Sequence, residues 1–230
     1  MNLNDQEKNI LTYKSAFKFD RRSYCVYYIS LLRTKNILFF SFCNNNDYNS
    51  RIIKIDLFFI NFVIYFTVNA LFFNDNTMNK IYEDEGAFNL SYQLPQITYS
   101  FLISSFLNVV LKLLALSEKN IIELKKNKVK NDLEIRVIQL NSRLDIKFAL
   151  YFIISFIVLL SFGYYLIMFC AVYRDTQIHL LKDTLISFGL TLIYPFGINL
   201  LPGIFRIPSL SKSKKNKKCL YNFSLLLQII

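Results

Sequence analysis

The 230 residues are 53% hydrophobic and only 19% charged, whereas a soluble domain carries about 45–50% apolar and about 25% charged residues. The formal net charge of +11 would suit nucleic acid, but the Lys and Arg residues cluster beside long apolar runs, as membrane topology requires. The composition therefore excludes an ordinary soluble domain and argues against nucleic acid as a partner.

Residues 1–50 contain two apolar patches, and neither reaches the roughly 20 residues that cross a bilayer. Tyr24–Leu32 and Ile37–Cys43 are separated by the basic stretch Arg33–Asn36, which would be costly at mid-membrane. We interpret residues 1–50 as a cytoplasmic or interfacial segment, with a re-entrant hairpin as the alternative. The first 20 residues lack the features of a signal peptide, so the first span is expected to be an uncleaved anchor.

Four apolar segments have about the length that crosses a membrane. They cover residues 57–73, 95–116, 148–173 and 184–205. The last contains Pro195 and Pro202; such helix breakers are tolerated where neighbours satisfy the freed backbone groups, and we expect a kink there. The chain is therefore predicted to be an all-α integral membrane protein, with a bundle of about four transmembrane helices within residues 51–206.

The basic residues alternate along the chain in a way that predicts its orientation. There are nine Lys and Arg before the first span, then one, eight and two in the three gaps between spans, and six from Arg206 onward. Positive charge is retained on the cytoplasmic side. Both termini and the connector 117–147 are therefore expected in the cytoplasm, and residues 74–94 and 174–183 on the opposite side.

The connector 117–147 carries the apolar stripe of an amphipathic helix. Val129, Leu133, Val137, Leu140 and Leu144 recur every three or four residues, which places them on one helix face. We expect this helix to continue into the third span, although its two heptads are too few for a coiled coil.

Several stretches resemble a family of uncharacterised multi-pass membrane proteins of protists. They are NDYNSRIIKI (46–55), TVNALFFNDNTMNKIYEDEGAF (67–88), YQLPQITYS (92–100), LLALSEKNI (113–121) and CAVYRDTQIHLLKDTLISFGLTLIYPFGINLLPGIFRIPSL (170–210). The resemblance covers most of residues 46–210 and implies a membrane region of unknown activity, without catalytic residues. It also raises the question of whether the chain is a short or truncated member.

Three spans carry polar residues at helical spacing, and these are the candidate site residues. The stripes are Asn61, Tyr65 and Asn69; Ser100, Ser104, Asn108 and Lys112; and Thr184, Ser187, Thr191, Pro195 and Asn199. Residues four apart share a helix face, so each stripe is able to face the bundle interior. We expect either a polar path or hydrogen bonds between helices, each of which contributes about 0.6 kcal/mol in membranes.

Isolated polar features are expected to have simpler roles. Lys112 lies close enough to the predicted cytoplasmic end of its span for its long stem to snorkel. His179, the only histidine, has no ligand or catalytic motif around it and is expected to be an ordinary surface residue. The acidic cluster Glu83–Glu85 lacks the ligand spacing of an EF-hand and is expected to be a solvated loop.

The residues from 207 to 230 form a predicted basic cytoplasmic tail. It includes five lysines that are expected to contact anionic lipids or to fix topology: Lys212, Lys214, Lys215, Lys217 and Lys218. Cys219–Ile230 is too short to cross a membrane and is expected to be an interfacial helix. On the predicted outer side, Asn89-Leu90-Ser91 is a glycosylation sequon.

No catalytic motif, metal-ligand set or cofactor fingerprint emerges from the sequence, and the four cysteines are too far apart for a paired framework. We therefore expect free thiols, no cofactor and no enzymatic activity. The favoured function is a membrane anchor or assembly subunit, with the lipid bilayer and a homo- or hetero-oligomer as partners. A channel or transporter subunit is the alternative, and an intramembrane enzyme is the third reading.

Overall fold

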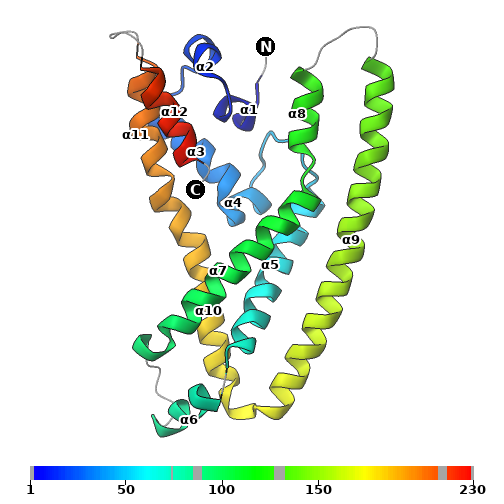
Figure 1. Cartoon of the computed structure of the whole chain (residues 1–230), viewed down its shortest axis with the longest axis vertical. Helices are drawn as coiled ribbons and strands as arrows, with labels where there is room; N and C mark the ends of the chain where they lie inside the picture. The colour runs from blue at the N-terminus through cyan, green and yellow to red at the C-terminus, as the bar shows by residue number, and fades with distance from the viewer. Residues whose placement is uncertain (1–2, 74, 85–89, 127–132, 212–216, 229–230) are drawn as a thin grey trace. The chain divides into compact units, whose positions relative to one another are not determined.

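The computed structural model describes residues 3–73, 75–84, 90–126, 133–211 and 217–228. Helices account for 86% of the structure, and the described ranges contain no strand. In chain order (Figure 1) the elements are α1 Asp5–Asn9, α2 Tyr13–Phe19, α3 Tyr24–Lys35, α4 Ile37–Phe42, α5 Arg51–Leu71, α6 Asp75–Glu83, α7 Leu90–Ala115, α8 Glu118–Lys126, α9 Leu133–Val172, η2 Arg174–Thr176, α10 Gln177–Ile198, α11 Leu200–Ser209 and α12 Lys218–Leu227.

Within the described ranges, four helical segments are long and apolar enough to cross a membrane, the same number that the sequence predicts. They are Arg51–Leu71, Gln93–Ala115, Glu134–Val172 and Arg174–Ser209. The third lies in one helix of 40 residues, α9. Over its described residues the amphipathic stripe therefore does continue into the span, as the spacing of its apolar residues predicts.

The chain forms two compact units, which are described separately. Unit 1 contains residues 1–49 and 192–230, and unit 2 contains residues 50–191. The predicted boundaries, at residues 50 and 206, group all four spans together. The structure instead assigns the end of α10 and all of α11 to the unit that contains the N-terminal residues.

The fourth span is interrupted where its prolines predict a kink. A helix proline has no backbone N–H and crowds the preceding turn, and the break between α10 and α11 lies in the turn that precedes Pro202. At the break, the backbone N–H and the side-chain Nδ2 of Asn199 both donate to the Pro195 carbonyl, at 3.1 and 2.7 Å. The helix thus ends at Ile198 and resumes at Leu200 with this carbonyl satisfied.

In unit 2, α5 packs against α7 and α9, and α7 also packs against α9. The ring of Phe188 on α10 lies against the rings of Phe58, Phe62 and Tyr65 on α5, with centroids 5.2–5.6 Å apart. A second apolar cluster joins the ends of α5, α9 and α10 to α6. Its buried members are Ala70, Phe73, Ile81, Phe169 and Leu180.

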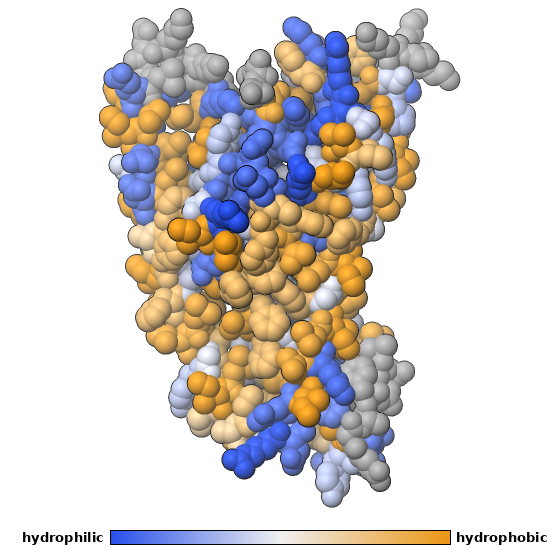
Figure 2. All heavy atoms as spheres, turned by 180° about the vertical axis from the view of Figure 1, so that it is seen from behind, coloured by the Kyte–Doolittle hydropathy of each residue, from blue (hydrophilic) through white to orange (hydrophobic). Residues whose placement is uncertain are grey.

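Large apolar side chains of unit 2 also point outward. Phe156, Leu160 and Ile167 on α9 are 58–70% exposed, as is Phe106 on α7 at 68%. In the most apolar part of α9 only 11% of the residues are buried, against 56% for α5. Figure 2 shows hydrophobic side chains over much of the visible face. This outward apolar surface is what a lipid environment favours.

In unit 1, the N-terminal helices pack on the end of α10 and on α11. Three side chains donate to backbone carbonyls spaced four residues apart: Asn36 to Leu192 at 2.7 Å, Tyr28 to Phe196 at 3.0 Å and Tyr24 to Leu200 at 2.9 Å. Asn36 also separates α3 from α4, because its side chain accepts the N–H groups of the first turn of α4. At 12 and 6 residues, neither helix reaches membrane length.

Gly203 on α11 allows the close approach of Tyr24. A Cβ atom at this position would lie 2.6 Å from Tyr24 Cε2, and the ring is held by the hydrogen bond from its hydroxyl to the Leu200 carbonyl.

We predict that Gly203→Ala destabilises unit 1 by about 1–3 kcal/mol through overpacking, which circular dichroism would detect as a lower melting temperature. Gly163→Ala is the matched control, because nothing lies within 4 Å of that site on α9. Equal melting temperatures for the two variants would contradict this packing.

Candidate functional site

Polar side chains from α5, α7 and α10 meet inside unit 2. We call the hydrogen-bonded set the polar seam; its residues are Tyr65, Asn69, Gln96, Ser105, Asp183, Ser187 and Thr191. All except Ser105 are buried. On α5 and α10 the seam residues lie four apart, at 65 and 69 and at 183, 187 and 191, which places them on one face of each helix. Gln96 and Ser105 join them from α7.

Asn69 and Ser187 link α5 to α10. The amide Nδ2 of Asn69 donates to Ser187 Oγ at 2.8 Å and to the Tyr65 carbonyl at 2.9 Å. The Ser187 hydroxyl in turn donates to the Asp183 carbonyl at 2.8 Å. Both side chains are fully buried. The amide nitrogen of Asn69 thus has the partners that its burial demands, whereas its Oδ1 has none.

Tyr65 connects all three helices at the next level of the seam. Its hydroxyl accepts a hydrogen bond from Thr191 Oγ1 at 2.5 Å and lies 3.2 Å from Ser105 Oγ on α7. The ring is completely buried and packs edge-on against Phe188. Tyr65 is therefore a polar link within an otherwise aromatic contact.

Asp183 is the one carboxylate of the seam and is completely buried. Its Oδ2 accepts a hydrogen bond from Gln96 Nε2 at 3.3 Å, and the same amide reaches the Asn69 carbonyl at 3.5 Å. Its Oδ1 has no hydrogen-bond partner. Among the described residues, no cationic side chain forms an ion pair with Asp183.

The sequence interpretation placed Asp183 in the outer connector and did not consider Gln96. Both follow from spacing: Asp183, Ser187 and Thr191 are four apart, and Gln96 lies four residues before Ser100. Extending each stripe by one turn would have identified them.

The remaining stripe residues occupy several places. Asn61 and Asn108 are buried in unit 2, and Asn61 Nδ2 and Oδ1 and Asn108 Oδ1 have no partner among the described residues. Lys112 lies half-buried in the last turn of α7. Asn199 lies in unit 1 and bonds to its own helix. Of the twelve stripe residues, four belong to the hydrogen-bonded seam: Tyr65, Asn69, Ser187 and Thr191.

A cavity of about 910 Å³ opens at the α6 end of unit 2. Met78, Ile81 and Glu83 line it from α6, and Arg174 and His179 from the opposite side. His179 is 5% exposed and its Nδ1 has no hydrogen-bond partner. The prediction of an ordinary surface histidine therefore does not describe its position.

Other predicted sites lie mostly outside the described residues, namely Asn89 and the lysines at 212, 214 and 215. Lys217 Nζ donates to the Pro208 carbonyl at 2.9 Å, and Lys218 begins α12. Tyr221 of that helix is buried against the N-terminal segment, where its hydroxyl donates to the Leu11 carbonyl at 2.7 Å. Across the described ranges, no group of His, Cys, Asp and Glu side chains is placed to bind a metal.

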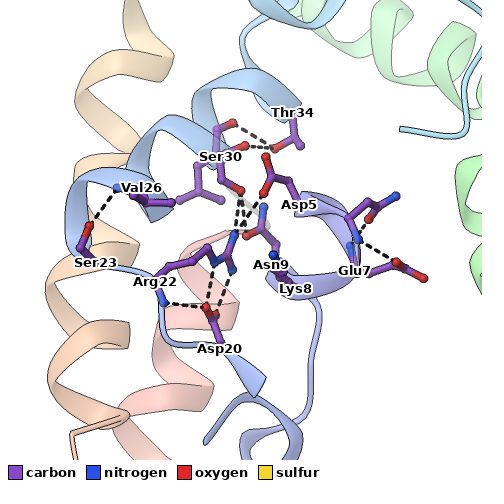
Figure 3. A network of polar contacts seen from close by, with 12 residues as sticks. Asp5, Glu7, Lys8, Asn9, Asp20, Arg22, Ser23, Val26, Ser30 and Thr34 are labelled. Carbon is purple, nitrogen blue, oxygen red and sulfur yellow. Dashed lines mark hydrogen bonds and ion pairs between the residues drawn. The ribbon is translucent and has the colours of Figure 1, made fainter. Parts of the chain in front are cut away.

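Unit 1 has its own buried ionic network, centred on Asp20 (Figure 3). Arg22 forms two hydrogen bonds to the two oxygens of Asp20, at 2.8 and 2.9 Å. Its Nη1 donates to Ser30 Oγ at 2.9 Å. Such a paired arrangement fixes the turn between α2 and α3.

Arg206 on α11 approaches Asp20 as a second cation. Its Nη2 lies 2.9 Å from Asp20 Oδ2, and its remaining donors reach the carbonyls of Lys8 and Asn9. The guanidinium is fully buried between the rings of Tyr27 and Tyr221, with Cζ 5.0 and 4.9 Å from their centroids. In the sequence Arg206 counts only as the first of the six basic residues at the C-terminal end, which gives no indication that it is buried and paired with Asp20.

The network perturbs the titration of its members. Burial raises the pKa of Asp20, but Arg22 and Arg206 outweigh it, so the pKa falls below its ordinary value. Burial raises the pKa of Tyr27 to about 12 despite the two guanidinium groups. Both shifts favour the protonation states found near neutral pH, with Asp20 charged and Tyr27 neutral.

Comparison with protein-family models, curated proteins and solved structures found no match for this chain.

The Asn69–Ser187 bond predicts coupling across α5 and α10. In a double-mutant cycle with Asn69→Ala and Ser187→Ala, we expect a coupling free energy of about 0.6 kcal/mol, the average for such bonds in membranes. The measurement is unfolding in mixed micelles. Asn61→Ala with Ser187→Ala is the control pair and should show none. Equal coupling in both cycles would contradict the bond.

The depressed pKa of Asp20 predicts acid sensitivity of unit 1. Its stabilising contribution is present above the unfolded value of 3.8 and is lost as the pH falls through the lower folded value. Melting temperatures by circular dichroism should therefore fall below about pH 4 in the wild type and change less in Asp20→Asn.

At neutral pH, Arg206→Met should lower the free energy of unfolding by about 3–5 kcal/mol, because it breaks a buried ion pair. A variant as stable as wild type would refute this role.

Proposed function

We propose that this chain is an integral membrane protein that acts as a non-enzymatic anchor or assembly subunit. The observation that supports this most directly is the exposed apolar surface of its membrane-length helices. On α9, Phe156 and Ile167 are 63% and 70% exposed. In water, each Å² of such surface would cost about 25 cal/mol relative to burial.

We also propose that both termini and the connector 117–147 are cytoplasmic. The alternation of Lys and Arg along the chain supports this orientation. The lysines of the tail, including Lys217 and Lys218, then adjoin the cytoplasmic headgroups, where each contributes about 1 kcal/mol toward anionic lipids. Membership of the protist membrane-protein family belongs to the same proposal.

The assembly role follows from the limited burial of α9. Only 11% of the residues in its most apolar part are buried within the protein. The rest of that surface is available to lipid or to the helices of another subunit. Since lipid tails already surround apolar side chains well, association there would depend on packing and on polar contacts.

A channel or transporter subunit is the second candidate, and the polar seam favours it. Polar residues of α5, α7 and α10 form hydrogen bonds to one another along one buried line. A simple anchor does not require a buried carboxylate such as Asp183 in that line.

Cysteine accessibility tests the proposed orientation. In a background with the four native cysteines replaced, single cysteines are placed at Asp84, Gln177, Lys119 and Ser211, all of which are exposed. On intact vesicles with the cytoplasmic face inside, an impermeant thiol reagent should label Asp84→Cys and Gln177→Cys at least tenfold faster than the other two. Permeabilised vesicles, which should label all four, are the control. Fast labelling of Lys119→Cys from outside would overturn the topology.

The same reagents separate the two candidate functions. Cysteines at Asn61 and Asn108, both buried, should stay unreactive in an anchor. Reaction of either with a small impermeant reagent would indicate a water-filled path and favour transport.

A further inference from the structure

We infer that Asp183 is the anionic centre of a binding site for one small monovalent cation, either Na⁺ or a proton, within the polar seam. The inference deepens the second candidate function and rests on it for its biological meaning. The site itself is argued from the buried groups of unit 2.

The charge of Asp183 requires compensation that the described residues do not supply. Removing a carboxylate from water costs several kcal/mol even after relaxation. Asp20 in unit 1 meets this cost with two guanidinium groups. Asp56 in unit 2 accepts the Tyr151 hydroxyl at 2.7 Å and is only half-buried. Asp183 is completely buried and has one neutral amide, Gln96.

Oxygen atoms around Asp183 are available as ligands. Asp183 Oδ1, Asn69 Oδ1, Gln96 Oε1 and Thr184 Oγ1 have no hydrogen-bond partner. Asn69 and Gln96 use their amide nitrogens for the bonds within the seam, which leaves their oxygens for a cation. Oxygen donors are the ligands of hard cations.

The charge of the site selects a monovalent ion. Asp183 is the only carboxylate in the seam, so one positive charge makes the site neutral. The titratable and charged groups nearby are His179 and Lys182 on α10 and Tyr65 on α5. Lys182 is exposed, and Gln96 and Ser100 on α7 do not titrate.

The cavity beside α6 lies about one helix turn from this site along α10. His179 lines the cavity and lies four residues before Asp183 on the same face of α10. Four residues correspond to about 6 Å of helix rise. Two carboxylates, Glu83 and Asp175, line the cavity together with one cation, Arg174.

Carboxyl modification of the wild-type chain tests the site. The purified full-length protein in neutral detergent micelles is treated with dicyclohexylcarbodiimide, an apolar reagent for protonated carboxyl groups, and the labelled residue is identified by mass spectrometry. Reactions are run from pH 5.5 to 8.5 in choline chloride, and again with 100 mM NaCl or KCl in its place.

Each outcome decides the matter. Modification of Asp183 that Na⁺ slows at least fivefold relative to choline identifies a sodium site. Modification slowed only by raising the pH identifies a proton site. No modification of Asp183 at any pH, or a rate indifferent to both Na⁺ and pH, overturns the inference. The assay needs no knowledge of orientation, so its failure is separate from a failure of the topology experiment.

Variants provide the matched comparison. Gln96→Leu removes the amide that donates a hydrogen bond to Asp183. For a sodium site, it should raise at least fivefold the Na⁺ concentration that halves the rate of Asp183 modification. For a proton site, it should shift the pH at which that rate is halved. Asp56→Asn removes another carboxylate of unit 2 and should leave this Na⁺ concentration and this pH unchanged. Circular dichroism verifies that each variant is folded. If Asp56→Asn changed protection as much as Gln96→Leu, the assignment to Asp183 would fail.

Discussion

Polar groups buried among apolar helices must find hydrogen-bond partners inside the protein, because neither lipid nor a dry core offers any. This constraint governs both units. In unit 2 it draws the polar faces of α5, α7 and α10 together and leaves apolar side chains of α7 and α9 outside. In unit 1 it explains why Tyr24, Tyr28 and Asn36 each donate to a carbonyl of α10 or α11.

Asp20 and Asp183, two buried carboxylates, meet this constraint in opposite ways. Asp20 and Arg206 neutralise each other, and Arg22 together with two tyrosine rings completes their surroundings. That arrangement has little left to bind and is best understood as structural. Asp183 has hydrogen-bonding capacity left over, as do several of its neighbours. The contrast is the reason that function is assigned to unit 2 rather than to the more extensive network of unit 1.

The sequence predicts the apolar architecture well and the polar contacts poorly. Long runs such as Leu57–Phe73 determine span number because length and hydropathy are local properties. The continuity of α9 and the break before Pro202 are also local. By contrast, the partner of Arg206 lies 186 residues away in Asp20, and no spacing rule connects them. Asp183 was missed because a span was assumed to end at its first charge, although a carboxylate with an amide neighbour extends the polar stripe by a full turn.

The contacts of Arg206 also have a consequence for biosynthesis. Its guanidinium joins α11 to the carbonyls of Lys8 and Asn9, across sequence separations of 198 and 197 residues. A ribosome makes α1–α4 before α11, so these helices gain this partner only after the 197 residues that separate Asn9 from Arg206 have been translated. During that interval the apolar and charged surfaces of α1–α4 remain without their final neighbours, which is the condition that recruits chaperones. Unit 1 is thus completed only after all of unit 2 has been synthesised.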